Sequence, residues 1–224
     1  MTNSPSNTPT RELPVRPSLT QLRNQAKELL SSAKSGDPSA VAELASVCRG
    51  DEPKLADAQH ALAKSCGAAN WARLVHACQI SELIWRGEEA ALERLLLQHP
   101  ALISQDVRIR ASNWGPPLSY AATVGSLSVV KMLLGIGAKE VDRAFDRASL
   151  KGHLEIADLL REQGAKPKRG CVMGPCETLN SRGLAYLLGS GAEFCDEGGD
   201  PLVPLGLIFQ TYSRNPQGRA ECLK

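Results

Sequence analysis

Apolar side chains recur every three or four residues from Leu19 onward, which is the spacing of one face of a helix. The first such stretch begins after Ser18, a residue suited to accept a hydrogen bond at a helix N-terminus, and Gln21 stands three residues further on. Gly36 ends it. The apolar positions of this first helix are Leu19, Leu22, Ala26, Leu29, Leu30 and Ala33.

Three more helices of the same kind are predicted before residue 78. Asp37-Pro38 is a typical helix start, Gly67 ends the third helix, and Asn70 begins the fourth. The side chains expected to face inward are Val41, Leu44, Ala45 and Cys48, then Leu55, Ala58, Leu62 and Cys66, then Trp71, Leu74, Val75 and Cys78. Residues 1–17 hold Ser, Thr, Asn and Pro with few large apolar side chains, so we expect a disordered tail followed by a helical segment over 18–77.

The rest of the chain repeats at a fixed interval. Gly-Ala dipeptides begin at Gly137, Gly164 and Gly191, 27 residues apart, and Gly125 and Gly152 are separated by the same distance. A constant period of this size is typical of one supersecondary unit stacked many times, that is, of a solenoid. The helical segment over 18–77 would cover the apolar end of that stack.

The repeating unit resembles an ankyrin repeat. Pro117-Leu118 and Ala121-Ala122 match the Pro-Leu and paired alanines of the ankyrin pattern, and Gly125 matches the glycine between its two helices. The stretch 129–138 then follows the pattern V-V-x-L-L-L-x-x-G-A. The helical segment before it is similar to the lead-in of some bacterial ankyrin proteins. The resemblance implies an all-α ankyrin-type solenoid, preceded by about four helices.

We expect about five units over 78–224, each with two helices. The first has its helices at 78–86 and 88–98. The fourth is degenerate, because the Gly- and Pro-containing stretch 170–176 replaces its first helix, and the last, from 200 to 224, is incomplete. A period of 27 residues, shorter than the usual ankyrin period of about 33, leaves room only for short connectors and no β-hairpins.

The charge balance and the hydropathy of the chain argue against two classes of function. The 26 basic and 24 acidic residues nearly balance, which argues against a nucleic-acid surface, and no apolar run is long enough to cross a membrane. Lys166, Lys168 and Arg169 form one basic cluster, which is either a solvated loop or a phosphate contact. No secretory signal is recognisable, so we expect a cytoplasmic protein.

The cysteines and histidines do not form a convincing site. Seven cysteines is an odd number, which argues against a disulfide framework. Four of them fall on predicted helix faces and are expected in the core: Cys48, Cys66, Cys78 and Cys222. A zinc site or a redox pair at Cys171, Cys176 and Cys195 is a weaker alternative, because the spacing does not fit well. We therefore expect no metal, no cofactor and, since no catalytic motif is present, no enzyme activity.

The ankyrin resemblance also implies a binding surface. In that family the end of each first helix and the connector tips contact the partner. The positions that correspond to these are Trp85, Arg86, Trp114, Tyr120, Thr123, Val124, Arg147, Leu150 and Lys151. Trp85 could instead pack against the N-terminal helices, and Tyr120 within its own repeat. If these side chains are exposed, replacing them should weaken binding without unfolding the protein.

These observations favour a monomeric, non-enzymatic module that binds a protein partner. The alternative is that the array is the targeting or regulatory arm of a larger enzyme or sensor whose active domain lies beyond Lys224. Because the last predicted helix runs to Lys224, we expect the chain to be part of a longer protein.

Overall fold

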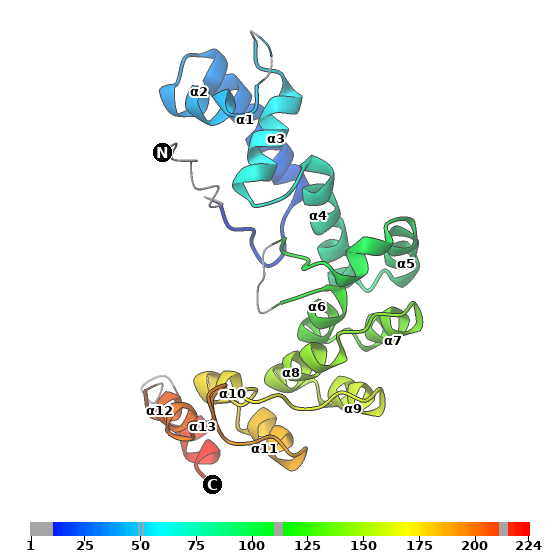
Figure 1. Ribbon diagram of the computed structural model, residues 1–224, viewed down its shortest axis with the longest axis vertical. Helices are drawn as coiled ribbons and strands as arrows, with labels where there is room; N and C mark the ends of the chain where they lie inside the picture. The colour runs from blue at the N-terminus through cyan, green and yellow to red at the C-terminus, as the bar shows by residue number, and fades with distance from the viewer. Residues whose placement is uncertain (1–10, 49, 51, 110–113, 211–214) are drawn as a thin grey trace. The chain divides into compact units, whose positions relative to one another are not determined.

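A computed structural model of the chain describes residues 11–48, 50, 52–109, 114–210 and 215–224 (Figure 1). Within those residues all regular structure is helical, which confirms the all-α prediction. The α-helices are α1 Leu19–Lys34, α2 Pro38–Ala45, α3 Leu55–Ser65, α4 Trp71–Arg86, α5 Glu89–Gln98, α6 Pro117–Val124, α7 Leu127–Gly135, α8 Val141–Lys151, α9 Leu154–Glu162, α10 Met173–Thr178, α11 Ser181–Gly189, α12 Leu202–Gln210 and α13 Pro216–Cys222; a 3-10 helix, η1, spans Pro100–Ser104.

The chain forms two compact units. The first consists of Met1–Leu83 with Asp106–Ser112, and the second of Ile84–Gln105 with Asn113–Lys224. The division cuts through α4, whose last residues belong to the second unit.

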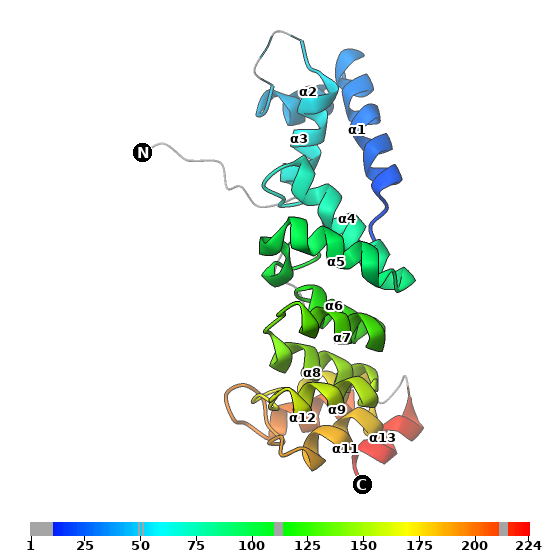
Figure 2. The ribbon, with the colours of Figure 1, turned by 90° about the vertical axis from the view of Figure 1, so that its right-hand side faces the viewer.

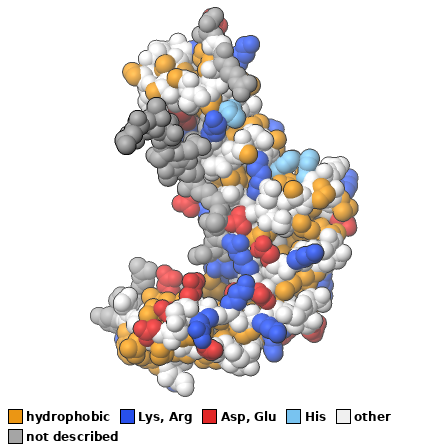
Figure 3. Space-filling view, in the orientation of Figure 1, with side chains coloured by type: hydrophobic (Ala, Val, Ile, Leu, Met, Phe, Trp, Pro, Cys, Tyr) orange, Lys and Arg blue, Asp and Glu red, His pale blue; other side chains and the backbone are white. Residues whose placement is uncertain are grey.

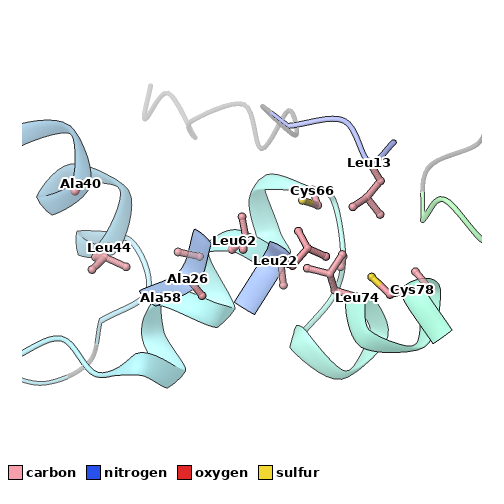
Figure 4. Close-up of a cluster of buried hydrophobic side chains, with 14 of the residues drawn as sticks. Leu13, Leu22, Ala26, Ala40, Leu44, Ala58, Leu62, Cys66, Leu74 and Cys78 are labelled. Carbon is pink, nitrogen blue, oxygen red and sulfur yellow. The ribbon is translucent and has the colours of Figure 1, made fainter. Parts of the chain in front are cut away.

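The first unit is built around α1, α2, α3 and most of α4. Its helices begin as the sequence predicts: the side chain of Ser18 accepts a hydrogen bond from the Gln21 amide, and that of Asp37 from the Ala40 amide. Helix α1 packs against α2 and α3, and Figure 4 shows their small and branched side chains meeting in one cluster. The prediction for α2 is wrong in part, because Ala40 and Leu44 face the core while Val41 is 46% exposed.

The segment 11–17 is ordered, so the expected disordered tail is wrong for these residues. Leu13 is only 3% exposed and belongs to the core cluster. The Arg11 amide donates to the Ser65 carbonyl at 2.9 Å, and Arg16 pairs with Glu82 on α4 at 2.9 Å. These contacts hold the segment against α3 and α4; residues 1–10 of the expected tail lie outside the described residues.

Helix α4 is continuous, where the sequence suggested two helices meeting at residues 77 and 78. No helix-breaking residue stands between Asn70, whose side chain accepts from the Arg73 amide, and Gly87. Gly87 has a φ of +68°, which ends the helix. The expected domain boundary therefore falls inside a helix, and the compact units divide six residues further on, after Leu83.

The second unit consists of helix pairs with a recurring backbone. Helix α6 packs against α7 and α8, and α8 against α9, while α5, α7 and α9 lie one beside the next (Figure 2). The residues after α6, α8 and α10 are Gly125, Gly152 and Leu179, and all three adopt positive φ values of +89°, +75° and +53°. The 27-residue register thus persists at Leu179, where the sequence has no glycine.

The fourth pair differs from the prediction. The stretch expected to lack a helix contains the start of α10, six residues long, held by the buried side chains of Pro175 and Cys176. Asn180 is the N-cap of α11 as predicted, and its side-chain Nδ2 also donates to the Leu150 carbonyl of the preceding pair at 2.6 Å.

The last pair, α12 and α13, follows the predicted order. Asn215 accepts from the Gly218 amide and so begins α13, and α12 packs against α10. Several large apolar side chains of these two helices remain in contact with solvent: Leu202, Val203, Phe209 and Leu223.

Candidate functional site

The candidate site is the set of positions at the ends of α4, α6 and α8. Three of the nine candidates are exposed there: Trp85, at 41%, Arg86 and Lys151. Val124, Arg147 and Leu150 are half-buried. We call Trp85, Arg86, Val124, Arg147 and Lys151 the helix-end row.

Tyr120 is a candidate that the structure places inside the protein. Its side chain is fully buried, and its hydroxyl accepts a hydrogen bond from Trp85 Nε1 at 2.8 Å. The Trp114 ring lies 5.1 Å from the Tyr120 ring, tilted by 45°. Tyr120 therefore holds the exposed Trp85 in place and does not itself offer a surface.

Thr123 is buried as well, and Leu150 is half-buried. The Thr123 hydroxyl, on α6, donates to the Ser119 carbonyl at 2.8 Å, and its oxygen lies 3.5 Å from Arg147 Nε on α8. Leu150 packs against Gly174, where an added Cβ would come within 3.0 Å of Leu150 Cδ1. The sequence places these residues at the correct helix ends, but α10 and the neighbouring helix turns cover their side chains.

Charged groups on α8 surround the row. Asp142 pairs with Lys168 at 3.7 Å and accepts from the Lys166 amide at 3.0 Å. Burial raises the pKa of Asp146 to about 7, and one of its carboxylate oxygens is buried without a hydrogen-bond partner. Burial, and then the neighbouring Arg143, lower the pKa of Arg147. Figure 3 shows basic and acidic side chains side by side over this part of the second unit.

Asp146 is the residue of this region that sequence reasoning missed. The available signal was its spacing of four from Asp142, which puts both carboxylates on one face of α8, next to the buried positions Phe145 and Ser149. A charged residue at the edge of a buried helix face is desolvated, which explains its raised pKa.

Two of the three cysteines considered for a zinc site or a redox pair have desolvated thiols. Burial raises the pKa of Cys171 and of Cys176 to about 12, which keeps both thiols protonated at neutral pH. In the part of the chain that is described, no three His, Cys, Asp or Glu side chains are grouped so that they could hold a metal ion. Nor does any helix there have both the length and the apolar character needed to span a membrane.

His153 takes part in packing between two helix pairs. Its ring lies over Gly125, where an added Cβ would come within 2.6 Å of Cε1. Gly137 has a similar φ of +93° but open space around it.

Replacing Gly125 by alanine should lower the free energy of unfolding by about 1–2 kcal/mol, because the new Cβ is strained by the positive φ and also displaces the His153 ring. Gly137→Ala, which meets only the strain, should cost about 1 kcal/mol. Urea denaturation of both variants measures the difference. In Gly125→Ala/His153→Ala the extra loss should disappear; an equal loss with and without His153 would contradict the packing role.

The chain was compared with known families and proteins. No family model matches it, and no curated protein matches it.

Proposed function

We propose that the chain is an ankyrin-type helical solenoid that binds a protein partner through the helix-end row. The observation that carries the proposal is the state of Trp85, whose large side chain is 41% exposed while its indole N–H is fixed on the buried Tyr120 hydroxyl. A side chain held in this way loses little conformational entropy when a partner covers it.

The residue types in the helix-end row also support binding of a protein partner. Tryptophan and arginine are the residue types that most often dominate the binding energy of protein interfaces. Arg86, Val124 and Lys151 occupy equivalent positions, directly before Gly87, Gly125 and Gly152, and Trp85 precedes Arg86. Stacking equivalent helices brings equivalent side chains to one surface, as in other repeat proteins.

The 27-residue recurrence of the left-handed positions and the lateral packing of successive pairs favour the solenoid interpretation. We propose that the protein acts by binding alone, in the cytoplasm and as a monomer.

Affinity capture with the 224-residue chain, followed by mass spectrometry, tests the proposal when it is run beside Trp85→Ala/Arg86→Gln/Lys151→Gln. The three residues are exposed, so the variant should remain folded. Proteins retained by the wild type and lost from the variant are the expected result.

A matched control removes two exposed basic residues from the second helices of their pairs, Arg94 on α5 and Lys131 on α7. Arg94→Gln/Lys131→Gln should retain the same proteins as the wild type. Equal capture by all three proteins would place the binding surface elsewhere.

A further inference from the structure

We infer that the helix-end row binds an acidic segment of polypeptide, whose carboxylates pair with Arg147 and Lys151 on α8. This inference rests on the proposed function and names the chemistry of the partner.

Three basic residues form a stripe along α8. Arg143, Arg147 and Lys151 are spaced by four, so their side chains follow one another on a single face of the helix. Like charges at this spacing destabilise a helix slightly, which makes the stripe costly unless an anion neutralises it.

The neighbouring carboxylates pair with Arg143 or with groups outside the stripe, and not with Arg147 or Lys151. Asp142 is engaged by Lys168 and by the Lys166 amide, and Glu140 lies 3.8 Å from Arg143. Throughout the described residues, neither Arg147 nor Lys151 forms an ion pair.

Asp146 is the remaining acidic group beside Arg147. Its carboxyl is desolvated, and the repulsion of Arg143 on Arg147 outweighs the attraction of Asp146. The half-buried guanidinium of Arg147 is therefore left with a hydroxyl, that of Thr123, as its polar contact. A carboxylate brought to it from outside would form a charge-assisted hydrogen bond in a partly water-excluded place, where such bonds are strongest.

The setting favours a polypeptide over a nucleic acid. Glu140, the N-cap of α8, and Asp142 in its first turn interrupt the positive charge, which suits separated carboxylates better than a continuous phosphate backbone. Val124 and Trp85 offer apolar surface in the same row, which suits a segment that mixes acidic with apolar side chains.

A library of random dodecapeptides displayed on phage, selected on the immobilised 224-residue chain at about 0.05 M salt, tests the inference without knowledge of the natural partner. We expect the selected peptides to be enriched in Asp and Glu. Synthetic copies should bind roughly tenfold more weakly to Arg147→Gln/Lys151→Gln, the size expected for losing one charge-assisted hydrogen bond. Their binding should also weaken when the salt is raised.

Two further variants separate the possible outcomes. Lys151→Gln changes only an exposed side chain and keeps the test valid if the double variant is poorly folded, while Arg94→Gln/Lys131→Gln should bind like the wild type. Peptides without acidic enrichment that still lose binding in Trp85→Ala would overturn the acidic-segment inference and leave the proposed function intact. Binding that neither Trp85→Ala nor the α8 variants affect would count against both.

Discussion

Replacing Tyr120 by alanine should lower the free energy of unfolding by about 3–5 kcal/mol, the usual cost of removing a buried aromatic side chain. The ring is fully buried and lies against the Trp114 ring, and its hydroxyl accepts from Trp85 Nε1. The substitution leaves a cavity and frees the Trp85 indole at the same time. Urea denaturation followed by circular dichroism measures the loss, and tryptophan fluorescence reports the change at Trp85 and Trp114.

Tyr120→Phe separates the two contributions. It keeps the ring and removes the hydroxyl that accepts the hydrogen bond from Trp85 Nε1, so it should cost about 1 kcal/mol. The same substitution should weaken partner binding by more than its small effect on stability explains, because Trp85 is no longer held. If Tyr120→Ala unfolded within about 1 kcal/mol of the wild type, the burial of this ring would be contradicted.

Replacing Asp146 by asparagine should raise the free energy of unfolding at pH 8 by about 2–3 kcal/mol. The folded pKa of Asp146, about 7, lies above the value of 3.8 for an ordinary aspartate. Between these two pKa values the carboxyl of Asp146 stays protonated in the folded state but has lost its proton in the unfolded state. The free energy of unfolding therefore falls as the pH rises from about 4 to about 7. Asparagine has nearly the same shape and no ionisable group, so the variant does not undergo this fall in the free energy of unfolding. A pKa shift of this size corresponds to about 4 kcal/mol of unfolding free energy. The gain expected for Asp146→Asn is smaller because the carboxyl is partly exposed to solvent.

The pH dependence itself provides the control. Lys168 and Arg147 act to lower the pKa of Asp146, and Asp142 acts to raise it. Asp146 in turn raises the pKa of Cys171. Wild type and Asp146→Asn should differ little in stability below about pH 4, diverge between about pH 4 and about pH 7, and keep a constant difference above that range. Carbon-13 NMR of the Asp146 carboxyl gives the titration midpoint directly. A midpoint near 4, or a stability difference that does not change with pH, would show that the carboxyl is solvated.

The helices were predictable because their signals are local. Ser18, Asp37, Asn180 and Asn215 each accept a hydrogen bond from an amide three residues on, and any sequence window that contains them carries that information. The ordering of 11–17 was not predictable in this way. It depends on contacts of Leu13 and Arg16 with residues far along the chain.

The place of the candidate site along the chain could be predicted from the sequence, but the exposure of its side chains could not. Residues 117–123 of α6 are all buried, so helical periodicity does not distinguish an inner face from an outer one there. The pattern therefore could not decide whether Tyr120 packs within its own repeat, and it placed the buried Thr123 among the candidates. Trp85, Arg86 and Lys151, at helix ends, are exposed. The spacing of Asp146 from Asp142 indicates its place at the edge of the buried face of α8, but the extent to which its pKa is raised depends on burial between elements, which no local pattern contains.

The sequence separation of the contacts has a consequence for the order in which the two units can form during synthesis. In the second unit, five side-chain hydrogen bonds between different helices or their caps span 24 to 40 residues. Each pair can therefore fold onto its predecessor soon after it is made, since only short loops must close. The first unit includes a bond from Arg108 Nε to the Leu13 carbonyl, across 95 residues. The N-terminal segment can form this hydrogen bond only after α5 and Arg108 have been synthesised. The part of the protein that is made first therefore reaches its final structure late.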